Sequence, residues 1–66
     1  MRIQLNGQER QVPDGTTLAE LLAELDLPGE GVAVAVDRAV IPRGDHAEHR
    51  LTEGAEVEVI RAVGGG

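Results

Sequence analysis

The feature that most constrains the fold is one amphipathic stretch, TTLAELLAELDLPGEG, at residues 16–31 of a 66-residue chain. Leu18, Leu21, Leu22 and Leu25 recur at i, i+3, i+4 and i+7. This spacing predicts a helix of about ten residues with one apolar stripe. Thr17 followed by Glu20 is typical of a capping box, and Pro28-Gly29 indicates a stop. One such helix can cover one face of a small sheet, so we expect a two-layer α+β domain.

Short alternating or apolar runs on both sides of the helix predict the strands of that sheet. Asn6-Gly7 is the strongest short-range hairpin signal, and Asp37-Arg38 indicates a second turn. The predicted order is strand, strand, helix, strand, short strand, strand, within one small mixed sheet. The runs are RIQLNGQERQV (residues 2–12), VAVAV (32–36), Ala39–Ile41 and AEVEVIRAV (55–63). We therefore expect one domain over residues 1–63 and a flexible glycine tail at 64–66.

Composition excludes several functions. The formal net charge is −6, from 12 acidic and 6 basic residues, which argues against nucleic acid as a partner because phosphates need a positive face. The acids could instead steer basic partners or only keep a small protein soluble. The chain has no Cys, Ser, Lys or Tyr, so a self-contained nucleophilic enzyme is not expected. Aromatic residues, which would stack on bases or sugars, are also absent.

The same composition bears on location. Without cysteine there are no disulfides and no thiolate metal site, which suits a reducing cytoplasm. The N-terminal run MRIQLNGQER has no apolar signal-peptide region, and no stretch is long enough to span a membrane. We expect a cytoplasmic chain that has no membrane partner and is a monomer when free.

Two polar clusters are weak candidates for chemistry. The segment DHAEH places His46 and His49 three residues apart, a spacing that could bring two imidazoles to a metal on a helical turn. Without a third spaced ligand, a solvated surface turn is the favoured interpretation, and we expect no metal. The acids Glu20, Glu24 and Asp26 are interpreted as the solvated face of the helix.

The chain ends in VGGG, so Gly66 carries the terminal carboxylate. Three glycines can extend by about 10 Å, enough to thread into a narrow site while the body stays outside. Activation of the carboxylate by a nucleoside triphosphate would create a mixed anhydride, and no Cβ would hinder attack on its carbonyl. Frayed termini are also common without any function. Tail chemistry alone leaves these two interpretations about equal.

The whole chain resembles the ThiS family, the small sulfur carriers of thiamine biosynthesis with the ubiquitin-like β-grasp fold. The resemblance rests on LNG, TTLAELLAEL, GVAVAVDRAVIPR, LTEGAEVEVIRAV and the terminal Gly65-Gly66. Gly64 adds a third glycine, and Ala55 stands where family members often have an acid.

The resemblance implies a carrier acted on by enzymes. A ThiF-type enzyme would adenylate Gly66, consuming ATP that the carrier itself does not bind. Sulfur from a cysteine desulfurase route would then replace AMP and leave a thiocarboxylate, which donates sulfur to thiazole synthase (ThiG). The residues imply no catalytic site on the chain itself, with Gly64 and Gly65 serving as the slender tail.

Other functions begin with the same adenylate. The small subunit of molybdopterin synthase has the same fold and terminal thiocarboxylate, and a third carrier would donate sulfur to other metabolites. A ubiquitin-like protein modifier would form an isopeptide through the same glycine. A plain interaction module with an inert tail is a further alternative.

Period-two alternation also predicts a core and a docking face. On the last strand Glu58, Ile60 and Ala62 should point outward. The ThiS-like fold would place the third and last strands side by side, giving a small outward patch for a partner: Ile60, Ala62, Ala33 and Ala35. The alanines alone would need no such explanation. The predicted core is Ile3, Leu5, Leu18, Leu21, Leu22, Leu25, Val32, Val34, Val57 and Val59.

Overall fold

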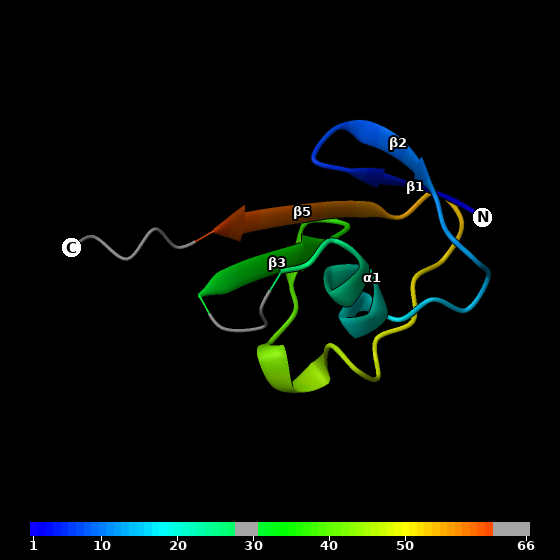
Figure 1. Cartoon of the computed structure of the whole chain (residues 1–66). Coiled ribbons are helices and arrows are strands. Elements are labelled where there is room, and N and C mark those ends of the chain that lie inside the picture. Colours follow the sequence, from blue (N-terminus) through cyan, green and yellow to red (C-terminus); the bar gives the residue numbers. More distant parts are fainter. Residues whose placement is uncertain (28–30, 62–66) are drawn as a thin grey trace.

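The part of the chain that the structure describes has five strands and one short α-helix, arranged in two layers (Figure 1). The structure is a computed structural model that describes residues 1–27 and 31–61. In chain order the elements are β1 (Arg2–Leu5), β2 (Gln8–Gln11), α1 (Leu18–Glu24), β3 (Val32–Val36), β4 (Ala39–Val40), the 3₁₀ turn η1 (Arg43–Asp45) and β5 (Glu56–Arg61). The predicted order and the α+β fold class are confirmed.

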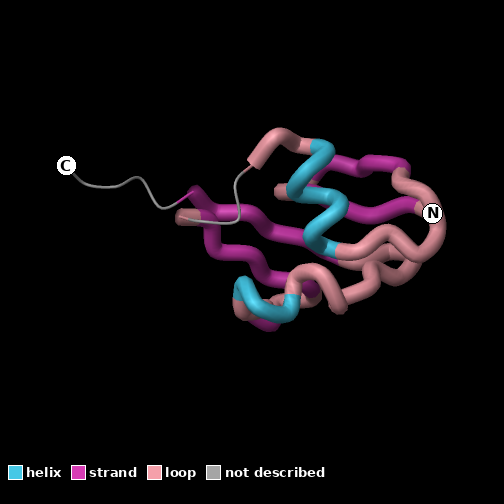
Figure 2. Tube along the Cα trace, turned by 60° about the horizontal axis from the view of Figure 1, so that its bottom comes forward, coloured by secondary structure: helices cyan, strands magenta, loops and turns pink. Residues whose placement is uncertain are grey.

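The sheet is mixed, with strand order β2-β1-β5-β3-β4. The last strand, β5, lies at its centre, parallel to β1 and antiparallel to β3. Figure 2 shows α1 crossing one face of these strands. The other face carries no helix in the part of the chain described, and we call it the open face. Because β5 is central, its first residues, Glu56 and Val57, lie between β1 and β3, and β3 continues to pair with it up to Arg61.

Helix α1 is shorter than predicted. Its start is as expected: Thr17 is the N-cap, and its side chain and that of Glu20 form the reciprocal capping box. The helix ends at Glu24 and has seven residues. A helix of about ten residues, ended by Pro28-Gly29, was predicted. The helix ends earlier because Asp26 has φ of 60°. The Leu27 N–H donates to the Leu22 carbonyl at 2.9 Å, which closes a Schellman motif. Pro28 and Gly29 lie outside the described residues.

Both predicted turns are present as tight hairpins. Asn6 and Gly7 have φ of 50° and 83°, which suits the twist of β1 and β2. Asp37 and Arg38 also have positive φ although neither is glycine. The Asp37 carboxylate accepts the Glu56 N–H at 3.0 Å, and this bond fixes the second turn against β5. The short strand β4 ends at Val40, one residue before the predicted Ile41.

The core lies between α1 and the inner face of the sheet. Six of the ten predicted core residues are buried, and the other four are half-buried against them: Leu5, Leu25, Val32 and Val59. Four further core residues were missing from the predicted core: Val12, Val36, Leu51 and Ala55. Leu51 comes from the polar segment before β5, so sequence periodicity gave no signal for it. Ala55 begins the predicted last strand in phase with Val57 and Val59, so its inward position followed from the alternation although it was left out of the predicted core.

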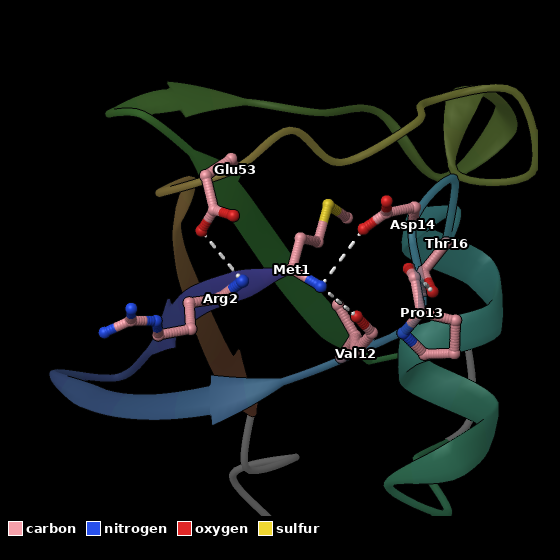
Figure 3. A network of polar contacts seen from close by, with 7 residues as sticks. All are labelled: Met1, Arg2, Val12, Pro13, Asp14, Thr16 and Glu53. Atoms are coloured by element: carbon pink, nitrogen blue, oxygen red, sulfur yellow. Dashed lines mark hydrogen bonds and ion pairs between the residues drawn. The ribbon is translucent and has the colours of Figure 1, made fainter.

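The N-terminal end is closed by a polar network (Figure 3). The Met1 amino group donates to the Val12 carbonyl at 2.7 Å and lies 3.1 Å from the Asp14 carboxylate. The Arg2 N–H donates to the Glu53 carboxylate at 2.8 Å. The start of β1 is thereby tied both to the loop before α1 and to the loop before β5.

Candidate functional site

The candidate site begins where β5 ends. The residues predicted to react or to form the tail, Gly64, Gly65 and Gly66, lie outside the described residues, as does Ala62 of the predicted patch. What the structure positions is the root of that tail, because β5 is described through Arg61 and pairs with β3 up to Val32↔Arg61.

The predicted alternation of β5 and its pairing with β3 are confirmed. Val57 is buried and Val59 half-buried on the helix side, while Ile60 is 62% exposed on the open face. Ile60 lies directly opposite Ala33. Since opposed residues point to the same face of a sheet, Ile60 and Ala33 share the open face. Ala35 also lies on the open face, two residues further along β3 and opposite Glu58.

Val40 extends this surface, although the patch predicted from the sequence did not include it. It lies opposite Ala35 in the β3–β4 hairpin and is 75% exposed. The two-residue turn at Asp37-Arg38 sets that register, so the turn prediction already contained the signal. We define the open-face patch as Ala33, Ala35, Val40 and Ile60. Ile60 near the end of β5 and Val40 on β4, level with Glu58, are two large exposed aliphatic side chains on one sheet face. Together they form a surface on which a partner can bury apolar area.

The rest of the open face is polar and acidic. Glu56 and Glu58 are exposed on β5, and Arg2 of β1 lies 3.7 Å from Glu9 of β2 in an exposed ion pair. The open-face patch is therefore bordered on one side by carboxylates. Such a border favours approach by a partner with basic groups around an apolar centre.

The histidine segment has a structural role, which corrects the expectation of a solvated turn. His46 is only 4% exposed, and its Nε2 lies 3.0 Å from the Ile41 carbonyl, to which it donates. The backbone carbonyls of His46 and His49 accept the N–H groups of Ala19 and Leu18 at 3.0 and 2.8 Å. This segment thus satisfies donors at the start of α1 that have no partner within the helix. Within residues 1–27 and 31–61 no group of three metal-ligating side chains occurs.

Of the three carboxylates predicted on the helix, Glu20 and Glu24 lie in α1, and Asp26 lies beyond its end. Glu20 is exposed, and hydrogen bonds from the Thr17 backbone N–H and then the Thr17 hydroxyl hold the pKa of its carboxyl below the ordinary value of 4.5. Glu24 lies 3.3 Å from Arg10 in an ion pair that joins α1 to β2. Both groups stabilise the helix, and neither is placed as a general acid or base.

Residues 3–66 match the model of the ThiS family. Over 66 residues the chain is 33% identical to the sulfur carrier protein ThiS of Escherichia coli strain K12, and the match covers both chains completely. It is also 41% identical to a thiazole synthase of Magnetococcus marinus and 30% identical to one of Paramagnetospirillum magneticum. The chain spans about a fifth of the length of these two thiazole synthases.

Solved structures give the same fold. The crystal structure of the thiamine biosynthesis protein ThiS from Geobacter metallireducens superimposes with a TM-score of 0.87 at 28% identity, and the match covers both chains completely. The solution structure of a thiamine biosynthesis protein from the same organism gives 0.82 and is covered over 88% of its length. The described part of the chain contains no helix long and apolar enough to cross a membrane.

Proposed function

The chain belongs to the ThiS family, the β-grasp sulfur carriers of thiamine biosynthesis, and we propose that the carboxylate of Gly66 is the group that carries the sulfur. The observation that carries the proposal is the match to the sulfur carrier of Escherichia coli over every residue of both chains. The family match also extends to residue 66. In this proposal the chain is a carrier without catalysis of its own.

The chemistry begins at a poor electrophile. A terminal carboxylate has a pKa of about 3.3–3.7, so it is an anion at neutral pH. An oxygen of the Gly66 carboxylate attacks the α-phosphorus of ATP, and pyrophosphate leaves with the electrons of the broken P–O bond. A sulfide-level sulfur nucleophile then attacks the carbonyl carbon, and AMP leaves. The product is a thiocarboxylate whose sulfur is the nucleophile for the next acceptor.

The partners follow from these steps. A ThiF-type enzyme supplies the ATP site. A cysteine desulfurase route supplies the sulfur as a persulfide, and a thiol reductant provides the two electrons that bring it to the sulfide level, so the carrier needs no bound cofactor. The acceptor is a thiazole synthase; relatives of this chain carry that name. We place the reactions in the cytoplasm, as expected from the sequence.

The body of the carrier docks through the open-face patch. Ile60 and Val40 are its large exposed aliphatic residues. Because the patch begins one residue from the last described position of β5, a partner that covers it also receives the chain that follows. Glu58 borders the patch and steers basic groups of the partner toward it.

Intact mass spectrometry tests the proposal. The chain is incubated with ATP, a ThiF-type enzyme, cysteine, a cysteine desulfurase and a thiol reductant, and we expect the mass gain of one oxygen-to-sulfur exchange on a C-terminal peptide. Omission of ATP is the matched control. The modified chain should then support thiazole formation by a thiazole synthase but not molybdopterin formation by the large subunit of molybdopterin synthase. If the same enzymes modify a known sulfur carrier but leave the mass of this chain unchanged, the proposal is refuted.

A further inference from the structure

Among the described residues, one side of β5 has no strand beside it near the end of β5. β1 pairs with β5 at Gln4↔Glu56 and Leu5↔Val57 and then turns away at Asn6. β5 continues to Arg61, past the tip of the β1–β2 hairpin (Figure 1). Within residues 1–27 and 31–61, no strand pairs with this side of β5 beyond Val57. The sheet therefore has an internal step, at which a central strand becomes an edge strand.

At this step, backbone groups of β5 point into the place beside it that a longer β1 would occupy, which we call the vacated position. The Asn6 N–H donates to the Val57 carbonyl at 2.9 Å, and the Asn6 Oδ1 accepts the Val59 N–H, also at 2.9 Å. The Asn6 side chain thus replaces the next ladder carbonyl that β1 would have supplied. By the alternation of strand hydrogen bonds, the Val59 carbonyl and the Arg61 N–H face the same side. These are the two groups that one residue of an added parallel strand would bond.

An apolar hollow lies on the helix side of the same position. It is lined by Leu5, Asn6, Leu25, Leu27 and Val59. Its four aliphatic side chains are half-buried against the core, so part of their apolar surface is open to a further side chain. In an added strand, the residue level with Val59 points to this side, because neighbours in register share a face.

The opposite side of the position is acidic. A second hollow, on the open face beside the hairpin tip, is lined by Gln4, Asn6, Gly7, Glu56, Val57 and Glu58. Glu56 and Glu58 are exposed there, and no basic side chain is among the described residues that line either hollow. A strand residue level with Ile60 would point to this acidic side, so a lysine or arginine fits it.

We propose that this position, the β5 notch, binds an extended segment of a partner protein in which apolar and basic residues alternate. The Val59 carbonyl and the Arg61 N–H bond its backbone. Its apolar side chain enters the hollow of Leu5, Leu25, Leu27 and Val59, and its basic side chain lies against Glu58. The β5 notch is distinct from the open-face patch, and its occupancy does not depend on sulfur transfer.

Titration of the isotope-labelled full chain with the peptide acetyl-KVKVK-amide tests the β5 notch by amide NMR. We expect saturable shifts centred on Asn6, Leu27, Val59 and Arg61, together with slowed hydrogen exchange of the Arg61 N–H. The charge-reversed peptide acetyl-EVEVE-amide should bind at least about tenfold more weakly because it places like charges against Glu58. Glu58→Lys should invert that preference, and since Glu58 is exposed, this variant is expected to keep the fold.

Arg61→Pro supplies the backbone test. It removes an N–H that faces the vacated side and leaves the bonds to β3 in place, a position where proline is tolerated in sheets. Binding of the peptide should be lost in Arg61→Pro and kept in the matched control Arg61→Ala, which retains the N–H. Shifts centred on Ala33, Val40 and Ile60, equal affinity for both peptides, or the absence of saturable shifts would each overturn the proposal.

Discussion

Asp26 holds the left-handed position that ends α1, and its N–H donates to the Ala23 carbonyl at 3.0 Å. Glycine is the residue usually found there, since a side chain in this conformation costs free energy. A carboxylate at a helix C-terminus also opposes the helix dipole. We expect Asp26→Gly to raise the free energy of unfolding by about 0.5–1 kcal/mol. This change in the free energy of unfolding is measured by urea denaturation.

The control Asp26→Asn separates the two causes. Asparagine removes the charge but tolerates the same backbone conformation, so it should deliver only the dipole part of the gain. Equal gains for both variants would mean that the positive φ costs nothing here.

Leu22 is 3% exposed and belongs to the core. Leu22→Ala leaves a cavity against the sheet and should lower the free energy of unfolding by about 2–5 kcal/mol, a large share of the stability of so small a domain. Val40→Ala removes aliphatic atoms from an exposed site and should change it by less than about 0.5 kcal/mol. Similar losses for the two variants would contradict the assigned core.

Ile60→Asp tests the open-face patch. Because Ile60 is 62% exposed, the thermal melt should change little, while the concentration of carrier that gives half-maximal adenylation should rise at least about tenfold, equivalent to 1.4 kcal/mol of binding. Gln4→Asp adds the same charge on the polar half of the open face and should leave the adenylation curve near that of the parent. An unchanged curve for Ile60→Asp would remove this residue from the interface.

The tail prediction concerns Gly66. Deletion of Gly66, or addition of one alanine after it, should abolish thiocarboxylate formation and leave the melt unchanged, because the reacting carbonyl is displaced or hindered. The measurement is the intact mass after the complete reaction. Sulfur on an extended chain that had not first been trimmed would show that the terminal position is not required.

Glu20 makes stability depend on pH. Its folded-state pKa is lowered by Thr17, so its stabilising effect is present above the ordinary value of 4.5 and is lost as the pH falls through the lowered value. The melting temperature of the parent should therefore drop below about pH 4.5 more steeply than that of Glu20→Gln. Parallel curves for the two proteins would indicate that the capping box does not couple to protonation.

The sequence predicted those features that depend on local pattern. The leucine stripe, the capping box, both hairpin turns and the outward position of Ile60 all follow from spacing within a few residues, and the structure has them. The buried positions of His46 and Leu51 could not be predicted, because they depend on how a polar loop folds back over α1. The early end of α1 was missed because an aspartate rather than a glycine takes the left-handed position.

The β5 notch lay beyond sequence reasoning for another reason. It exists because β1 is shorter than β5, and the lengths of paired strands are set by contacts between segments far apart in the chain. Asn6 gave a turn signal, but nothing in its neighbourhood indicated that its side chain would bond Val59. Ladder registers between distant strands are the information that the structure adds.

The parallel pairing of β1 with β5 also determines how the body responds to mechanical load. If an enzyme pulls on the chain after β5 while the N-terminal end of β1 is held, the two parallel strands are pulled in opposite directions. The hydrogen bonds between them are then loaded together in shear, and none can open before its neighbours. A fold built in this way can be pulled by the chain that follows β5 and keep its folded body.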